Sequence, residues 1–138
     1  MILTPGDVIL TLKIAVSAVT LLLVASLIAL IAGRPKLHGQ INTVFFALTA
    51  TTVLGFELVI RLVLPDLTAS FTGEQREALT VHLAFAIPAA IMLPAMLYTG
   101  KRKLKALHYA LAAIFAVLWT GTFVTGIFYL PHNIDPLP

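Results

Sequence analysis

Four long apolar stretches dominate this sequence and restrict it to a fold that crosses a membrane. They cover about residues 8–32, 41–64, 78–99 and 106–130. About 20 apolar residues in a helix span the roughly 30 Å hydrocarbon core of a bilayer. Only 11% of the residues are charged, whereas a soluble domain carries about 25%. We therefore predict an all-α, integral membrane four-helix bundle, with residues 1–138 forming one domain.

The first apolar stretch carries the signals expected at the two ends of a helix. Asp7 is a candidate N-cap, and Gly33 with Pro35 is expected to end the helix. One charge, Lys13, lies inside the stretch, and its long side chain is expected to snorkel to the nearby surface. A cleaved signal peptide fits less well, because the chain lacks a basic start and a small-residue cleavage motif before Gly33.

The charged residues of the loops divide between the two sides of the predicted bundle. The turns after the first and third spans hold the basic residues Arg34, Lys36, Lys101, Arg102, Lys103 and Lys105. The opposite side holds Arg76 together with Asp7, Asp66, Glu74, Glu77 and Asp135. Positively charged loops stay in the cytoplasm, so both termini are predicted on the outer, periplasmic side of a bacterial inner membrane. The net charge of +3 follows from these loops and does not indicate a nucleic-acid partner.

The second span carries an ionisable pair, Glu57 and Arg61, near its far end. Residues four positions apart lie on one face of a helix, so these two side chains can pair. Ionisable side chains at membrane depth are costly unless they are paired or hydrated, and they usually face a bundle interior or mark a site. We therefore expect this pair to have both a structural and a functional role.

The chain contains four histidines and no cysteine. The absence of cysteine excludes disulfides, thiolate metal sites, iron–sulfur clusters and covalent c-type haem. Histidines are therefore the main candidates for metal ligands. On the predicted topology, His38 and His108 lie at the cytoplasmic interface, whereas His82 and His132 lie near the outer interface, toward which the second span brings Glu57.

Three interpretations compete for the outer group of residues. His82, His132 and Glu57 together supply nitrogen and oxygen ligands suited to copper, zinc or iron. Alternatively, two histidines on adjacent helices bind haem iron from both faces. The third interpretation is that these are polar residues at helix ends, hydrogen-bonded to each other and to water. For His38 and His108, contact with lipid headgroups is the corresponding alternative.

Other functions fit the sequence less well. His108 and His132 are separated by roughly 36 Å along a helix, so the two histidine layers lie too far apart for direct electron relay. A transport pathway is not expected, because the spans show no inverted repeat and few polar groups near the midplane. Serine hydrolase, P-loop and dinucleotide-binding motifs are absent, and we expect no enzyme activity.

Four segments carry a resemblance to a known family. They are LHGQINTVFFALT, VHLAFAIPAAIMLP, KALHYALA and LWTGTFVTGIFYLPH, and they lie within about residues 37–132. These segments resemble the CtaM/YozB-like family of four-helix bacterial membrane proteins associated with haem–copper terminal oxidases. Members of this family carry histidines at such helix ends, and we expect the corresponding histidines here to bind a cofactor, haem or copper. The histidines concerned are His38, His82, His108 and His132.

The expected function is to assist assembly of a respiratory haem–copper oxidase, or to accompany it as an accessory subunit. The histidines would hold or shield haem or copper, and the partners would be membrane lipid and the subunits of the larger respiratory complex. Two alternatives remain open. One is a b-type haem subunit for electron transfer with histidine axial ligands, and the other is a purely structural subunit that packs against a larger membrane complex.

Overall fold

The structure, a computed structural model, describes residues 4–132, and its regular elements are all helical. The four α-helices are α1 (Pro5–Ile31), α2 (Pro35–Leu58), α3 (Gly73–Lys101) and α4 (Lys105–Val124). A π-helical turn, η1 (Val59–Val63), extends α2, and a second, η2 (Thr125–Tyr129), extends α4. Each of the four resulting helices is long and apolar enough to cross a membrane. The prediction of an all-α fold with four such helices is confirmed.

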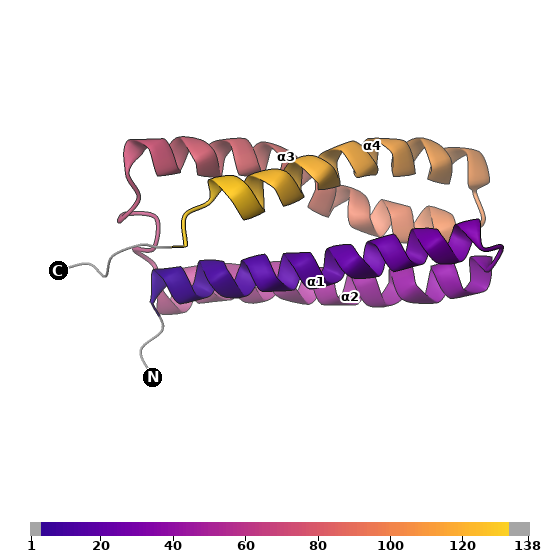
Figure 1. The fold of residues 1–138 in the computed structure, drawn as a ribbon, viewed down its shortest axis with the longest axis horizontal. Helices are drawn as coiled ribbons and strands as arrows, with labels where there is room; N and C mark the ends of the chain where they lie inside the picture. The colour runs from indigo at the N-terminus through magenta and orange to yellow at the C-terminus, as the bar shows by residue number, and fades with distance from the viewer. Residues whose placement is uncertain (1–3, 133–138) are drawn as a thin grey trace.

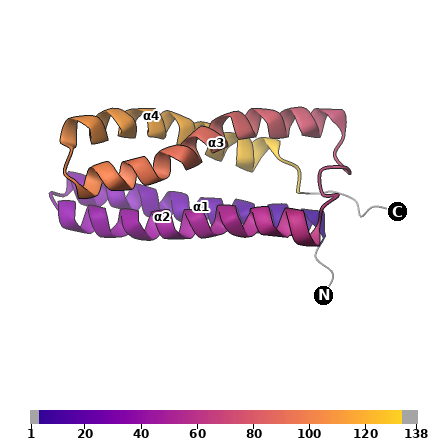
Figure 2. The ribbon, with the colours of Figure 1, turned by 180° about the vertical axis from the view of Figure 1, so that it is seen from behind.

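The helices form two hairpins, with α1 packed along α2 and α3 packed along α4. In Figure 1 the α1–α2 hairpin forms the lower layer and the α3–α4 hairpin the upper one. The helices α3 and α4 cross, so that α3 approaches the lower layer at one end and α4 approaches it at the other (Figures 1 and 2). Pro88 and Pro94 lie inside α3, which bends along its length (Figure 2).

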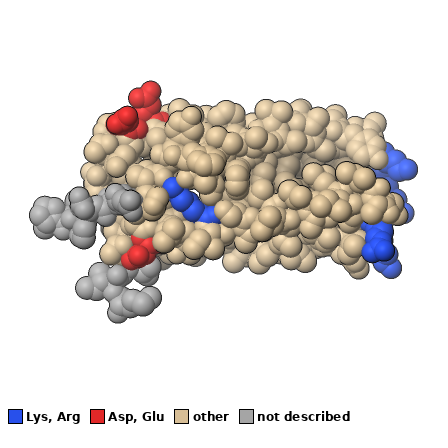
Figure 3. Space-filling model, in the orientation of Figure 1, with Lys and Arg blue, Asp and Glu red and all other residues tan. Residues whose placement is uncertain are grey.

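Charged side chains gather at opposite ends of the bundle (Figure 3). The basic end contains the two hairpin turns, with Lys and Arg at positions 34, 36, 101–103 and 105. The acidic end contains the start of α1, the connection between η1 and α3, and the end of η2. Its helix starts and connection carry Asp7, Asp66, Glu74 and Glu77, and Lys13, Glu57, Arg61 and Arg76 also lie toward this end. The charge separation on which the predicted orientation depends is therefore present in the fold.

Both helices that start at the acidic end are capped in the same way. Thr4 is the N-cap of α1, where its hydroxyl accepts a hydrogen bond from the Asp7 amide and the Asp7 carboxylate accepts one from the Thr4 amide. Thr72 and Gln75 form the same capping box at α3. The prediction that Asp7 is the N-cap was wrong. Pro5 is suited to the first helical position, which places Asp7 third in the helix.

The two hairpins are copies of one arrangement that run in the same direction. Equivalent residues recur at one constant separation along the chain: Gly33 and Lys103, His38 and His108, Phe45 and Phe115, Val19 and Ala89. The first pair adopts the left-handed conformation in each turn, with φ of 74° and 54°, and the last two pairs are buried. The repeat is parallel, unlike the inverted repeats common in transporters. The first helix ends just before Gly33 and Pro35, as predicted, and Pro35 also opens α2.

An aromatic cluster joins the two hairpins at the centre of the bundle. Trp119 stacks on Phe115 with a centroid distance of 5.6 Å and meets Phe45 edge-on at 5.1 Å. The Trp119 indole N–H donates to the Thr20 hydroxyl at 3.1 Å. Val19 of α1 and two α3 residues complete the cluster. All four helices therefore meet around Trp119.

A second apolar cluster lies at the acidic end. Leu67 and Phe71, from the connection between η1 and α3, are buried against Ile9 of α1. Partly buried residues from η1, α3 and the end of η2 surround them. The connection is therefore packed onto the bundle end, which places the residues of η1 beside a folded loop.

Replacing Gly121 with alanine is expected to destabilise the α3–α4 hairpin by about 1–3 kcal/mol. A Cβ at this position would overlap the body of the Phe85 ring, so the ring or the helix must move. The measurement is the free energy of unfolding in detergent. Gly55→Ala is the matched control, because a Cβ there meets nothing within 4 Å and glycine inside a helix costs about 0.5–1 kcal/mol relative to alanine. Equal losses in the two variants would contradict the prediction.

Candidate functional site

His82 lies about 14 Å along α3 from its first residue. Its ring is hydrogen-bonded to η2, the turn that extends α4 in the same hairpin. Its Nδ1 lies 2.9 Å from the Thr125 hydroxyl oxygen. That hydroxyl donates its single proton to the Gly121 carbonyl at 2.6 Å, as threonines in helices commonly do. The hydroxyl therefore accepts from His82, which places the imidazole proton on Nδ1. A Cβ at Gly126 would lie 3.0 Å from His82 Cε1, so glycine leaves room for the ring.

His108 repeats this arrangement at the basic end with the two helices exchanged. It lies in the first turn of α4, as predicted, and its Nδ1 is 3.0 Å from the Thr99 hydroxyl oxygen. Thr99 donates its own proton to the Ala95 carbonyl at 2.9 Å, so His108 also carries its proton on Nδ1. A Cβ at Gly100 would lie 3.2 Å from His108 Cε1. Each end of the α3–α4 hairpin thus places a Thr-Gly pair against a histidine.

The second ring nitrogen of His82 and of His108, Nε2, carries no proton. With the proton on Nδ1, the Nε2 atoms of His82 and His108 each present a lone pair, which is the form that binds a metal. Within residues 4–132, neither Nε2 has a hydrogen-bond partner. A ring fixed through one nitrogen by a polar neighbour is the usual environment of a metal-binding histidine.

His38 is held in a denser network, inside the first turn of α2 rather than before the helix. Its Nδ1 lies 2.8 Å from the hydroxyl oxygen of Ser26, a residue with no exposed surface. Ser26 donates to the Asn42 side-chain oxygen at 2.7 Å, and the Asn42 amide nitrogen lies 3.0 Å from His38 Nε2. Asn42 therefore covers the nitrogen that His82 and His108 leave open. His38 also lies close enough to His108 for their charges to interact.

His132 follows η2 and is exposed. Its Nδ1 lies 3.3 Å from the Lys13 ammonium, which also donates to the carbonyls of Ile127 at 2.8 Å and Leu130 at 2.6 Å. Because an ammonium only donates, His132 Nδ1 accepts. The Lys13 ammonium therefore reaches the last carbonyls of the fourth helix and His132 at the acidic end, and its snorkelling to a membrane surface stays a prediction.

The predicted pair of Glu57 and Arg61 is present, with Arg61 Nε donating to Glu57 Oε1. Both side chains are open to the surroundings, with exposed fractions of 73% for Arg61 and 45% for Glu57. They do not face the bundle interior. Across the part of the chain that the structure describes, no group of three or more His, Asp or Glu side chains is placed to hold a metal ion.

In the structure, the predicted residues of the outer site do not contact one another, and each contacts a different side chain. His82 is bound to Thr125, His132 to Lys13, and Glu57 to Arg61. It does bring His38 and His108 to the same end of the bundle, one from each hairpin. The hydroxyl and glycine partners of the histidines were not predicted, although the two Thr-Gly dipeptides at 99–100 and 125–126 are visible in the sequence. The ligand role of all these residues stays a prediction.

Comparisons with protein-family models, with curated proteins and with solved structures find no match to this chain.

Proposed function

We propose that this chain is a multi-pass protein of a bacterial inner membrane that holds haem or copper through its histidines while assisting, or accompanying, a respiratory haem–copper oxidase. Both termini lie on the periplasmic side in this proposal, because the basic end stays in the cytoplasm. The observation that carries the proposal is the shared state of His82 and His108. Each imidazole is fixed through Nδ1 by a threonine, and each leaves Nε2 free to bind a metal.

The histidines and Glu57 are not equally suited to bind haem iron or copper. Haem iron takes one imidazole on each face, and copper also binds imidazole nitrogen. His82 and His108 lie at opposite ends of the hairpin, so each would hold a separate group. At the basic end His38 would supply a second imidazole beside His108 once Asn42 releases its Nε2. His132 and Glu57 fit less well, because each already faces a cationic side chain.

The first experiment is a reduced-minus-oxidised visible spectrum, with metal analysis, of the detergent-purified protein and whatever copurifies with it. We expect a haem b signal or copper that is lost in His82→Ala or His108→Ala. Thr99→Val and Thr125→Val should weaken binding about 10–100-fold, because each removes the group that orients a ligand. Thr120→Val is the matched control, since its exposed hydroxyl contacts only its own helix.

The outcomes separate the alternatives. A stable, stoichiometric haem spectrum in the isolated protein favours the b-type electron-transfer subunit over an assembly factor. Copurified oxidase subunits without haem or metal, and unchanged oxidase activity after replacement of all four histidines, would favour the purely structural subunit. If the threonine variants and Thr120→Val bind the cofactor equally well, the proposed role of the hydroxyls is wrong.

A further inference from the structure

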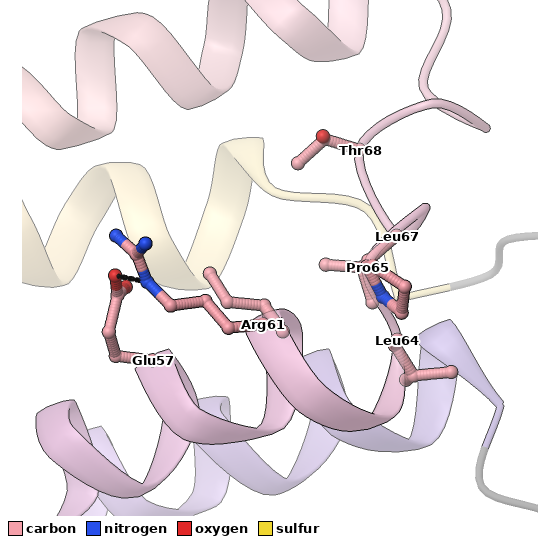
Figure 4. Close-up of a pocket in the computed structure, with 7 residues that line it drawn as sticks. Glu57, Arg61, Leu64, Pro65, Leu67 and Thr68 are labelled. Atoms are coloured by element: carbon pink, nitrogen blue, oxygen red, sulfur yellow. Dashed lines mark hydrogen bonds and ion pairs between the residues drawn. The ribbon is translucent and has the colours of Figure 1, made fainter.

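The exposed ion pair of α2 and η1 lines a hollow at the acidic end of the bundle. The hollow has a volume of about 440 Å³. Glu57 and Arg61 form its polar wall, and Ile60, Leu64 and Leu67 are among its apolar residues. Figure 4 shows the Arg61 side chain extending along this hollow from the last turns of the helix. The hollow is therefore lined by one guanidinium group and by apolar side chains.

The guanidinium of Arg61 has hydrogen-bonding capacity to spare. Its Nε donates to Glu57, and within residues 4–132 its two Nη atoms have no hydrogen-bond partner. The other cations of the acidic end are bound to backbone carbonyls. Lys13 binds those at the end of the fourth helix, and Arg76 donates to Phe71 at 3.3 Å and to residue 69 at 3.4 Å. Glu57 therefore binds the guanidinium through Nε alone. The two Nη atoms of Arg61, which form a planar fork, stay free on an exposed side chain.

The fork lies within the last turns of the second helix. Arg61 binds Glu57, seven residues before Leu64, where the helix ends, so the guanidinium lies about 10 Å along the axis from that end. A guanidinium fork binds two oxygens of a phosphate at once. The apolar walls beside it suit the chains that a phospholipid attaches to its phosphate. An open hollow with one cationic fork and apolar walls is thus complementary to a phospholipid.

We propose that this hollow binds the phosphate of a membrane phospholipid through the Nη atoms of Arg61, whose Nε is bonded to Glu57. The inference rests on the membrane location in the proposed function but not on the oxidase role or the histidines. A lipid bound here would contact η1 and the connection that follows it, including Thr68, which lies across the hollow in Figure 4.

The test is a lipid titration of the full-length, delipidated protein in detergent, read by native mass spectrometry. The probe is dioleoylphosphatidylglycerol. We expect one tightly bound lipid whose affinity falls at least about tenfold in Arg61→Gln, since a bidentate charged contact is lost. Arg61→Lys keeps the charge without the fork and should give an intermediate loss. Arg102→Gln is the matched control, because it removes the same charge at the basic end and should bind as the unchanged chain does.

Two further ligands identify the source of the phosphate. Dioleoylglycerol has the chains without the phosphate, and inorganic phosphate has the anion without the chains; both should bind at least about tenfold more weakly than the phospholipid. Inorganic phosphate binding as tightly would overturn the lipid assignment in favour of a free anion. Equal lipid affinity in Arg61→Gln and Arg102→Gln would overturn the site itself. Haem and metal content, measured on the same samples, should not change in Arg61→Gln, so failure here is distinct from failure of the proposed function.

Discussion

Replacing Trp119 with alanine should lower the free energy of unfolding of the bundle by about 3–5 kcal/mol, the range for removing a large aromatic side chain from a packed core. Trp119 is 7% exposed and packs against Phe45 of one hairpin and Phe115 of the other. Between membrane helices, most of the attraction comes from such close contacts, because lipid tails are as apolar as the core. Loss of the indole removes these contacts and leaves a cavity where all four helices meet.

The measurement is reversible unfolding in detergent, with two controls on the same helix. Trp119→Phe keeps a ring but loses the hydrogen bond to Thr20, and its cost from that bond alone should be about 1 kcal/mol. Ile114→Ala removes a side chain that is 53% exposed and should change stability by no more than about 0.5 kcal/mol. If Trp119→Ala cost no more than Ile114→Ala, the aromatic cluster would not be what joins the hairpins.

The helices themselves were predictable because each follows from a local property. Runs of about 20 apolar residues joined by a short charged loop identify each hairpin without reference to the rest of the chain. The exact residues at which the helices start were harder to predict from the sequence. Asp7 and Thr4 are both good capping residues, and only the reciprocal hydrogen bonds between them show that Thr4 is the cap and Asp7 its partner.

The environment of the histidines depends on how two helices are aligned. Sequence placed His108 at the start of a helix, which is confirmed, but its bond to Thr99 arises only when α3 and α4 pack in one particular register. The same holds for His82 and Thr125. A signal was nevertheless present, because each threonine is followed by a glycine that leaves space for an imidazole.

The outer group of residues shows why nearness in depth does not imply nearness in space. His82 faces α4 within its own hairpin, whereas Glu57 faces the hollow at the end of the other. Membrane depth follows from counting residues along a helix. The direction that a side chain takes around the helix depends on packing between hairpins, which the apolar pattern of these spans does not specify.

Lys13 shows how the packing of two helices determines the hydrogen-bond partners of a long cationic side chain. A lysine roughly 12 Å along the first helix has a stem long enough to reach the membrane surface, so snorkelling was the natural prediction. In the structure its ammonium binds the carbonyls of Ile127 and Leu130, near the acidic end of the bundle. These belong to the last turn of the fourth helix, where carbonyls lack partners within the helix. One cation therefore ties the first helix to the end of the fourth.

Lys13→Leu should consequently cost about 3 kcal/mol of stability, since hydrogen bonds to a charged group contribute about 1.5–3 kcal/mol each and unpaired carbonyls carry a further penalty. Hydrogen exchange should rise at residues 125–130, next to the lost contacts. Lys13→Arg, which retains charge and donors, should recover most of the stability. Lys36→Leu, at an exposed position of the basic end, should have little effect. If Lys13→Leu proved as stable as the unchanged chain, the ammonium would not hold these carbonyls.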